Sequence, residues 1–396
     1  MKNIATLTIL GLLSIFGSCN KDDSEAGGDL MSKDEYSSEP GSNNGSQGQY
    51  GPNNGDQGQY GLITAGEWND LSNWDFWGNL LNEQEYSSMP EYWGFHTKKR
   101  MSVAVRDNGI PQVNAKVELL RNETVIWTAR TDNFGYAELW VGLFQEDKSI
   151  DLSTLSLKVN DELQDQEPVL IEDGINEIEI NSNIGDIKKV ELSFIVDATG
   201  SMGDEIDFLK ADLKSVIDSV KRDDSNLDIY TSTVFYRDEG DDYVTRKSEF
   251  TSDLNNTIDF INRQDANGGD DFPEAVHTAL NTGINELQWS NTARTRIAFL
   301  LLDAPPHYTA KIVENIHGSI KDAARKGIKI IPVTASGIDR ETEFLMRFMA
   351  ISTNATYVFI TNDSGIGGGH LKPSVGQYEV EHLNDLMVRL IKKYSE

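Results

Sequence analysis

From residue 188 to the end of the chain, short apolar runs alternate with longer segments of helical periodicity. The apolar runs predict strands at 190–196, 229–235, 297–302, 328–334 and 357–360. The segments between them predict helices at 204–220, 257–261, 274–287, 312–324, 341–350 and 380–391. Because buried parallel strands read as nearly continuous apolar runs, we predict an α/β domain over residues 188–396. Its sheet should be doubly wound, mostly parallel and covered by helices on both faces.

Residues 98–182 carry a different pattern, in which apolar and polar residues alternate over short stretches. Met101, Val103 and Val105 follow this pattern, and turn-forming clusters stand at 107–109 and 131–135. Short strands separated by such turns predict a small all-β sandwich. The stretches VAVRDNGIPQVNAKVELL and ARTDNFGYAEL resemble the carboxypeptidase-regulatory-like family of extracellular sandwiches. That resemblance implies a spacer or adhesion module without catalytic residues.

Aromatic side chains are concentrated in residues 62–97, just before the predicted sandwich. Such density is found on carbohydrate-binding platforms, and also in segments that pack on a neighbouring domain through a large apolar area. We interpret residues 62–97 as an aromatic-rich linker that packs on a neighbouring domain.

The first residues have the pattern of a secretion signal. Lys2 precedes an apolar stretch at 4–16, which is too short to span a bilayer comfortably. Gly17 and Ser18 then precede Cys19, and this arrangement resembles the lipobox of bacterial lipoproteins. The resemblance implies a signal peptide at 1–18, lipid on Cys19 and an anchor in the cell envelope, with the outer membrane expected. An acidic run after Cys19 is similar to surface-export signals; an ordinary secretory signal with an incidental Cys is the alternative.

Residues 19–61 are rich in Gly, Asn, Gln and Ser, and a ten-residue unit occurs twice, at 41–50 and 51–60. Such a composition cannot bury enough apolar area to offset the entropy lost on ordering. We predict a disordered tether. An adhesive Gly/Tyr repeat is the alternative.

Composition and charge narrow the function classes. The chain has 396 residues and a formal net charge of −29, so its field repels phosphate backbones and no nucleic-acid partner is expected. A single Cys excludes a disulfide scaffold and cysteine-ligated zinc or iron–sulfur centres. The six His residues form no HExxH motif or other close pair, which argues against a His-based metalloprotease.

Three acidic motifs fall where the predicted α/β domain exposes loops at the carboxyl ends of its strands. They are DATGS at 197–201, GGDDFPE at 268–274 and DAPPH at 303–307. A single strand-terminal Asp is more often a helix cap or turn residue. Three such motifs together favour a site for a hard divalent cation, because these cations prefer carboxylate and hydroxyl oxygens.

At these motifs the chain resembles the von Willebrand factor A domain family, over residues 188–396. The resemblance implies a metal-ion-dependent adhesion site with ligands in three loops, namely Asp197, Thr199, Ser201, Asp271 and Asp303. Asp271 stands where the family usually has Thr and adds negative charge beside the ion. The implied ion is Mg²⁺, with Mn²⁺ or Ca²⁺ as alternatives. The implied partner is a protein or glycan whose acidic group completes the coordination.

The sequence therefore predicts a lipid-anchored envelope protein that mediates metal-dependent adhesion or interaction and is not an enzyme. A structural envelope lipoprotein, whose metal only stabilises the fold, is one alternative. An aspartyl-phosphate-type phosphatase is another, because DATGS echoes that motif with Asp197 as the nucleophile. Those enzymes generally place a second Asp two residues further on as acid/base, and this chain has Thr199 there.

Overall fold

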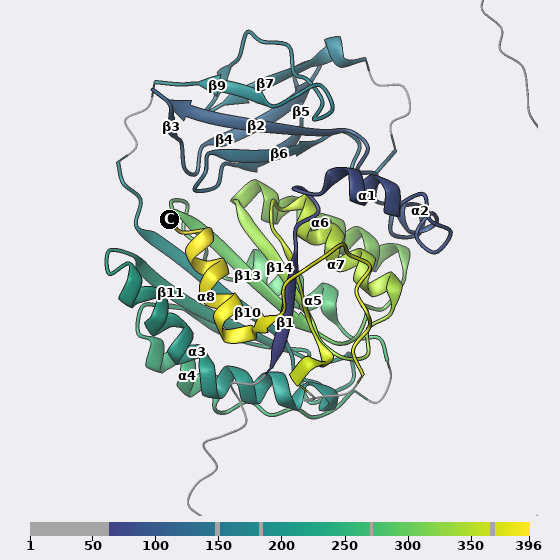
Figure 1. Ribbon diagram of the computed structural model, residues 1–396, viewed down its shortest axis with the longest axis vertical. Helices are drawn as coiled ribbons and strands as arrows, with labels where there is room; N and C mark the ends of the chain where they lie inside the picture. Colours follow the sequence, from purple (N-terminus) through teal and green to yellow (C-terminus); the bar gives the residue numbers. More distant parts are fainter. Residues whose placement is uncertain (1–62, 147–150, 182–184, 270–271, 365–368) are drawn as a thin grey trace, which may run out of the picture. The chain divides into compact units, whose positions relative to one another are not determined.

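The computed structural model describes residues 63–146, 151–181, 185–269, 272–364 and 369–396 (Figure 1). The predicted signal peptide, Cys19 and the whole of the predicted tether lie outside the described residues, as does Asp271. In the described part of the chain, no helix combines the length and the apolar character needed to cross a bilayer.

An eight-stranded sheet forms the centre of the C-terminal part, in the order β12-β11-β10-β13-β14-β15-β1-β16. Its parallel strands are β10 (Lys189–Asp197), β11 (Asp228–Tyr236), β13 (Thr295–Leu302), β14 (Ile328–Thr334) and β15 (Tyr357–Ile360). Antiparallel strands complete the edges, namely β12 (Thr245–Thr251), β1 (Thr64–Trp68) and β16 (Glu381–His382). The prediction of a mixed α/β domain with a mostly parallel sheet is confirmed.

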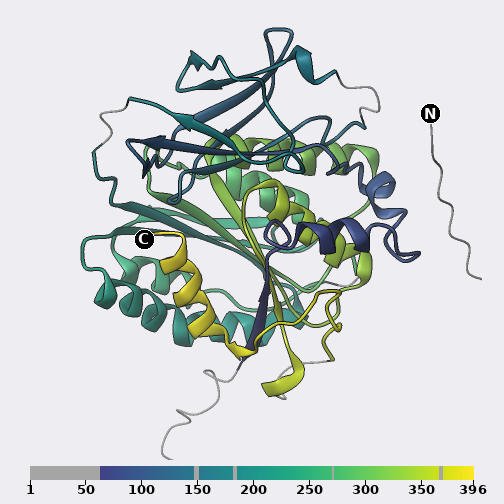
Figure 2. The same ribbon diagram turned by 45° about the horizontal axis from the view of Figure 1, so that its top comes forward.

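Helices cover both faces of this sheet (Figures 1 and 2). One face carries α3 (Gly203–Asp223), α4 (Leu254–Ile261) and α8 (Leu383–Lys393). The other carries α5 (Val276–Asn281), α6 (Ala310–Lys326) and α7 (Arg340–Ser352). Single helical turns are η2 (Leu152–Thr154), η3 (Gly200–Met202), η4 (Thr282–Glu286) and η5 (Asn362–Ser364).

The local sequence explains where these helices begin and end. The Thr309 side chain accepts a hydrogen bond from the amide of Ile312 at the start of α6, and Gly327 ends that helix with a left-handed φ of 70°. Asp339 caps α7 in the same way, accepting from the amide of Thr342. Every residue of β13 is buried, and its apolar run at 297–302 is the pattern expected of a strand between two helical layers.

Residues 98–181 contribute two four-stranded sheets. One consists of β2 (Arg100–Asp107), β3 (Ile110–Pro111), β6 (Tyr136–Trp140) and β9 (Asn176–Glu179). The other consists of β4 (Lys116–Arg121), β5 (Thr124–Arg130), β7 (Leu155–Val159) and β8 (Glu162–Leu163). These sheets support the predicted all-β domain in part, while its family resemblance and its boundaries stay predictions.

The aromatic-rich segment contains β1 and two short helices, α1 (Trp74–Leu80) and α2 (Met89–Trp93). The ring of Trp77 stacks on Phe344 of α7 with centroids 5.4 Å apart, and Phe95 stacks on Phe348. The sequence did not indicate that β1 is a strand of the central sheet, paired with β15. Its partner lies almost three hundred residues further along the chain, so local periodicity holds no sign of the pairing.

Candidate metal centre at the strand ends

Two predicted metal ligands lie together because β10 and β13 are neighbours. The strands run parallel, and Val196 of β10 is in register with Leu301 of β13. Asp197, the last residue of β10, and Asp303, the residue after β13, therefore lie at the same edge of the sheet. Both are buried, with exposed fractions of 0% for Asp197 and 6% for Asp303.

The first loop holds Asp197 in a fixed orientation. Its Oδ1 atom accepts hydrogen bonds from the backbone amide of Thr199 at 2.9 Å and from the Thr199 hydroxyl at 2.7 Å. The Thr199 side chain is itself buried. Oδ2 of Asp197 is buried and accepts no hydrogen bond from the described residues. One carboxylate oxygen is therefore used for positioning, and the other has no geometric hydrogen-bond partner among the described residues, although the buried Tyr236 hydroxyl lies close enough to lower the pKa of this carboxyl.

Ser201 and Asp303 form the second part of the site. Ser201 lies near Asp303, and its side chain offsets part of the rise that burial causes in the pKa of the Asp303 carboxyl. Oδ1 of Asp303 is buried and has no hydrogen-bond partner in the described part of the chain. The structure thus brings together Asp197, Thr199, Ser201 and Asp303.

Asp271 lies outside the described residues, but the start of its loop is described. The Gly200 amide donates to the Gly268 carbonyl at 3.1 Å, which joins this loop to the first one. Gly269 has a φ of 78°, and a Cβ there would lie only 2.8 Å from Cβ of Thr199. Glycine is therefore required for the loop to pass so close to Thr199.

The site is strongly acidic. Burial raises the pKa of Asp197 to about 7, and the negative charge of Asp303 adds to the rise. Burial also raises the pKa of the Asp303 carboxyl. Two carboxylates that lie near each other in a buried site disfavour one another's ionised form. A cation at the site would remove that repulsion.

Sequence reasoning missed two further acidic residues of this region. Burial, followed by the charges of nearby carboxylates, raises the pKa of Glu205 to about 7 and that of Glu274 to about 9. Glu205 lies in the first turn of α3, where an acidic residue would ordinarily be attributed to the helix dipole. Glu274 belongs to the GGDDFPE motif, and its amide donates to the Pro305 carbonyl, which links the second and third loops.

Basic side chains near these loops have other partners. Arg237 is buried and donates to the carbonyl oxygens of Ala198 and Asp265. His307 lies 2.7 Å from Oδ1 of Asp238 through its Nε2 atom. Both contacts hold the loops in position and leave the carboxylates of Asp197 and Asp303 uncompensated.

The donor set fits a hard divalent cation. It consists of two hydroxyl side chains and two carboxylates whose buried oxygens have no partner among the described residues. Mg²⁺, Mn²⁺ and Ca²⁺ all accept oxygen ligands of these kinds.

Comparison with known proteins agrees with this geometry. Residues 191–367 match the family model of the von Willebrand factor A domain, so the chain contains such a domain, as predicted. Domains of this family commonly bind a divalent cation and generally mediate protein interactions.

Two curated proteins share this kind of similarity. An ariadne-like RING finger protein (R811) of Acanthamoeba polyphaga mimivirus is 34% identical over 126 residues, which cover 32% of this chain and 12% of that protein. The alpha-protein kinase vwkA of Dictyostelium discoideum is 32% identical over 123 residues, which cover 30% of this chain and 19% of that protein. The chain thus spans less than a fifth of either relative.

Proposed function

We propose that this protein is a lipid-anchored component of the cell envelope whose von Willebrand factor A domain binds a protein or glycan through a divalent cation, with Mg²⁺ as the principal candidate. One observation carries the proposal. The buried carboxylates of Asp197 and Asp303 lie at the same sheet edge, and each has an oxygen for which the described part of the chain offers no partner.

Each residue of the proposed site would have its own role in binding the cation. Asp197 and Asp303 supply the negative charge that attracts the cation. Thr199 holds Asp197 through two hydrogen bonds to Oδ1, so that Oδ2 remains directed to the ligand. The hydroxyls of Thr199 and Ser201 add neutral oxygen ligands. When bound, the ion supplies a Lewis-acidic position that an acidic group of a partner can complete.

Asp271 would add a carboxylate from the second loop in place of the usual hydroxyl. A third negative charge tightens cation binding, and it also lowers the net positive charge offered to an acidic partner. We therefore expect strong cation binding combined with a modest affinity for the partner.

The anchor completes the proposal. Lipid on Cys19, after removal of residues 1–18, would hold the chain at the outer membrane, and residues 19–61 would act as a tether. This part rests on the sequence pattern at 1–23 and on the composition of 19–61.

The proposal is tested by a pull-down from envelope extract with the purified chain. We expect a partner to be retained with Mg²⁺ and lost with chelator, and lost also with Asp197→Ala. Asp218→Ala, at an exposed position on α3, is the matched control and should behave as wild type. Retention that is unaffected by chelator and by Asp197→Ala would favour the alternative in which the metal only stabilises the envelope protein.

A further inference from the structure

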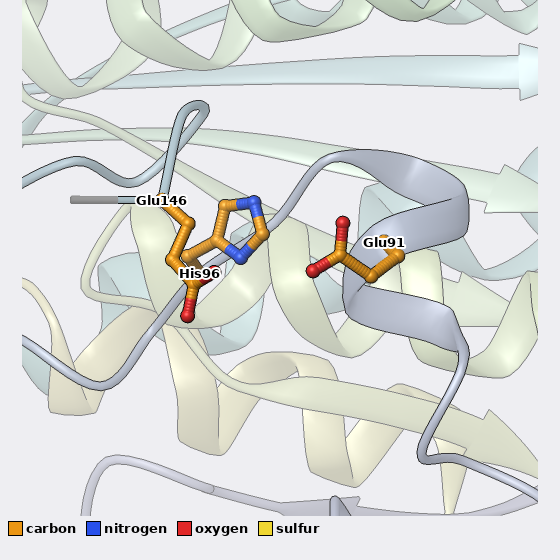
Figure 3. Close-up of side chains that lie close together, drawn as sticks. All are labelled: Glu91, His96 and Glu146. Carbon is orange, nitrogen blue, oxygen red and sulfur yellow. The ribbon is translucent and has the colours of Figure 1, made fainter. Parts of the chain in front are cut away.

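A second group of metal-binding side chains lies in the aromatic-rich segment and the loop after β6. Glu91, His96 and Glu146 each offer one ligand atom, and these three atoms all lie within 4.8 Å of one another. Figure 3 shows the Glu91 carboxylate directed toward the His96 ring. His96 is half-buried, and the two glutamates are exposed. Within the described residues Glu91 takes part in no ion pair, so its carboxylate is available.

The backbone brings these residues together. Gly94 follows α2 with a φ of 67°, and the Phe95 amide donates to the Pro90 carbonyl at 2.7 Å. This left-handed cap turns the chain back, so that His96 returns beside Glu91. A Cβ at position 94 would meet the His317 ring at 3.0 Å, so the turn depends on glycine.

The third ligand is held to the same loop by backbone hydrogen bonds. The His96 amide donates to the Leu143 carbonyl at 2.7 Å, and the Val141 amide donates to the Lys99 carbonyl at 3.1 Å. These bonds tie the loop of His96 to the segment that leads to Glu146. Phe95 is buried and stacks on Phe348 of α7, which fixes the residue before His96. The group is therefore preorganised on a supported backbone.

A cavity of about 610 Å³ lies against this group. Its lining includes all three residues together with the apolar side chains of Trp74, Trp77 and Leu81. An ion held by three side chains keeps a coordination position open, as catalytic and ligand-binding zinc sites do. Here that position would face a partly open cavity whose walls are apolar on one part and polar on another, where Lys98 and Lys99 lie, which suits a small ligand that carries an acidic group.

We propose that Glu91, His96 and Glu146 bind a transition-metal ion, with Zn²⁺ as the principal candidate, whose open position faces this cavity. One imidazole and two carboxylates suit Zn²⁺, whereas Mg²⁺ prefers oxygen ligands alone. In a tetrahedral site, ligand atoms about 2.0–2.2 Å from the ion lie about 3.3–3.6 Å from each other. The three ligand atoms lie within 4.8 Å of one another here, so the exposed side chains of Glu91 and Glu146 must rotate toward the ion when it binds. This site is separate from the strand-end centre and does not depend on it.

The test is calorimetric titration of the purified full chain with Zn²⁺ in excess Mg²⁺, which saturates the strand-end centre. We expect one zinc site, weakened more than about tenfold by His96→Gln and by Glu91→Gln, since even the loss of a ligand's hydrogen-bond partner costs about 10–100-fold. Glu172→Gln is the matched control, because Glu172 lines the same cavity outside the group and should leave affinity unchanged. Glu91 is exposed, so its variant keeps the test valid if His96→Gln impairs folding.

Two further readouts separate this site from the first. Asp197→Ala should leave zinc binding intact, and Co²⁺ substitution should give the visible absorption of a four-coordinate site that His96→Gln abolishes. Absence of zinc binding in the wild type, or equal affinity in wild type, His96→Gln and Glu91→Gln, would overturn the proposal. Neither result would affect the proposal for Asp197 and Asp303.

Discussion

Thr199 donates two hydrogen bonds to a single oxygen of Asp197, one from its amide and one from its hydroxyl. The two residues form a unit in which a short loop fixes the direction of a carboxylate. Bonds to an ionised acceptor are stronger than those between neutral groups. The unit thus sets the geometry of the proposed centre before any cation arrives.

Replacing Thr199 tests this unit. Thr199→Val keeps the shape of the side chain and removes the hydroxyl, so we expect Mg²⁺ affinity to fall by more than about tenfold while the domain stays folded. Thr199→Ser keeps the oxygen and should bind nearly as wild type. Calorimetric titration measures both. Equal affinity in wild type and Thr199→Val would mean that this hydroxyl neither binds nor orients the centre.

Removal of the cation should destabilise the protein. At about 100 times its dissociation constant, Mg²⁺ stabilises the folded state by roughly 2.7 kcal/mol relative to the chelated protein. Thermal melts with Mg²⁺ and with chelator measure the difference as a shift in Tm. In Asp303→Asn the shift should vanish, because a ligand is lost, whereas Asp218→Asn should retain it. A wild-type Tm that is indifferent to chelator would contradict a cation at this site.

His317 predicts a pH dependence of stability. Its ring stacks on Phe144 with centroids 4.3 Å apart, and its Nε2 atom lies 2.8 Å from the Trp93 carbonyl. Burial lowers the pKa of His317 below its usual value of 6.5. The unfolded chain therefore takes up this proton more readily than the folded one, and stability falls as the pH drops below 6.5.

Urea unfolding at pH 7.5 and at pH 5.5 measures this effect. His317→Gln should lose less stability between the two pH values than the wild type does. The matched control is His382→Gln, at an exposed position in β16, and it should lose as much as the wild type. If His317→Gln and the wild type respond alike, the ring does not set the pH dependence.

Removal of one partner from the ion pair of Asp70 and Arg347 should lower the free energy of unfolding. The guanidinium donates from Nε and Nη2 to the two carboxylate oxygens at 2.9 and 2.6 Å, and both side chains are buried. Asp70→Ala removes the closer of two carboxylate partners of the buried Arg347, which keeps Glu343 at 3.7 Å, so we expect a loss of up to about 3–5 kcal/mol. The double variant Asp70→Leu/Arg347→Met should lose much less. Urea unfolding of the wild type, Asp70→Ala and the double variant measures these free energies. A double variant as unstable as Asp70→Ala would contradict this account.

Cys19 carries the anchor prediction. Cys19→Ala should release the protein from membranes or leave it as unprocessed precursor, because no thiol remains for lipid to modify. Metabolic labelling with a radioactive fatty acid, together with membrane fractionation, tests this. Unlabelled wild-type protein would remove the basis for an anchor at this residue.

The sequence predicted the parallel core well, because buried strands such as β10 and β13 need continuous apolar runs on both faces. It also predicted that Asp197 and Asp303 would meet, because both follow strands that end at one edge of the sheet. Glu205 was missed because its position in a first helical turn has an ordinary explanation. The strand β1 was missed because its pairing with β15 depends on contacts that no local pattern encodes.

The group of Glu91, His96 and Glu146 illustrates the same limit. Glu91 and His96 meet only because Gly94 takes a left-handed conformation, and Glu146 reaches them through the backbone pairing beyond β6. In the sequence the His residues form no metal-binding spacing, so nothing there indicated this group. Turn geometry and long-range pairing decide such a site, and both become visible only in the folded chain.

The position of β1 has a mechanical consequence. The chain before residue 63 connects to the described residues through this strand, which lies between β15 and β16 and pairs with both. Tension on the preceding segment would act along β1, perpendicular to the hydrogen bonds of its antiparallel ladders. Bonds arranged in this way share a load and must yield together. The connection would therefore resist pulling more strongly than a terminal strand peeled away one bond at a time.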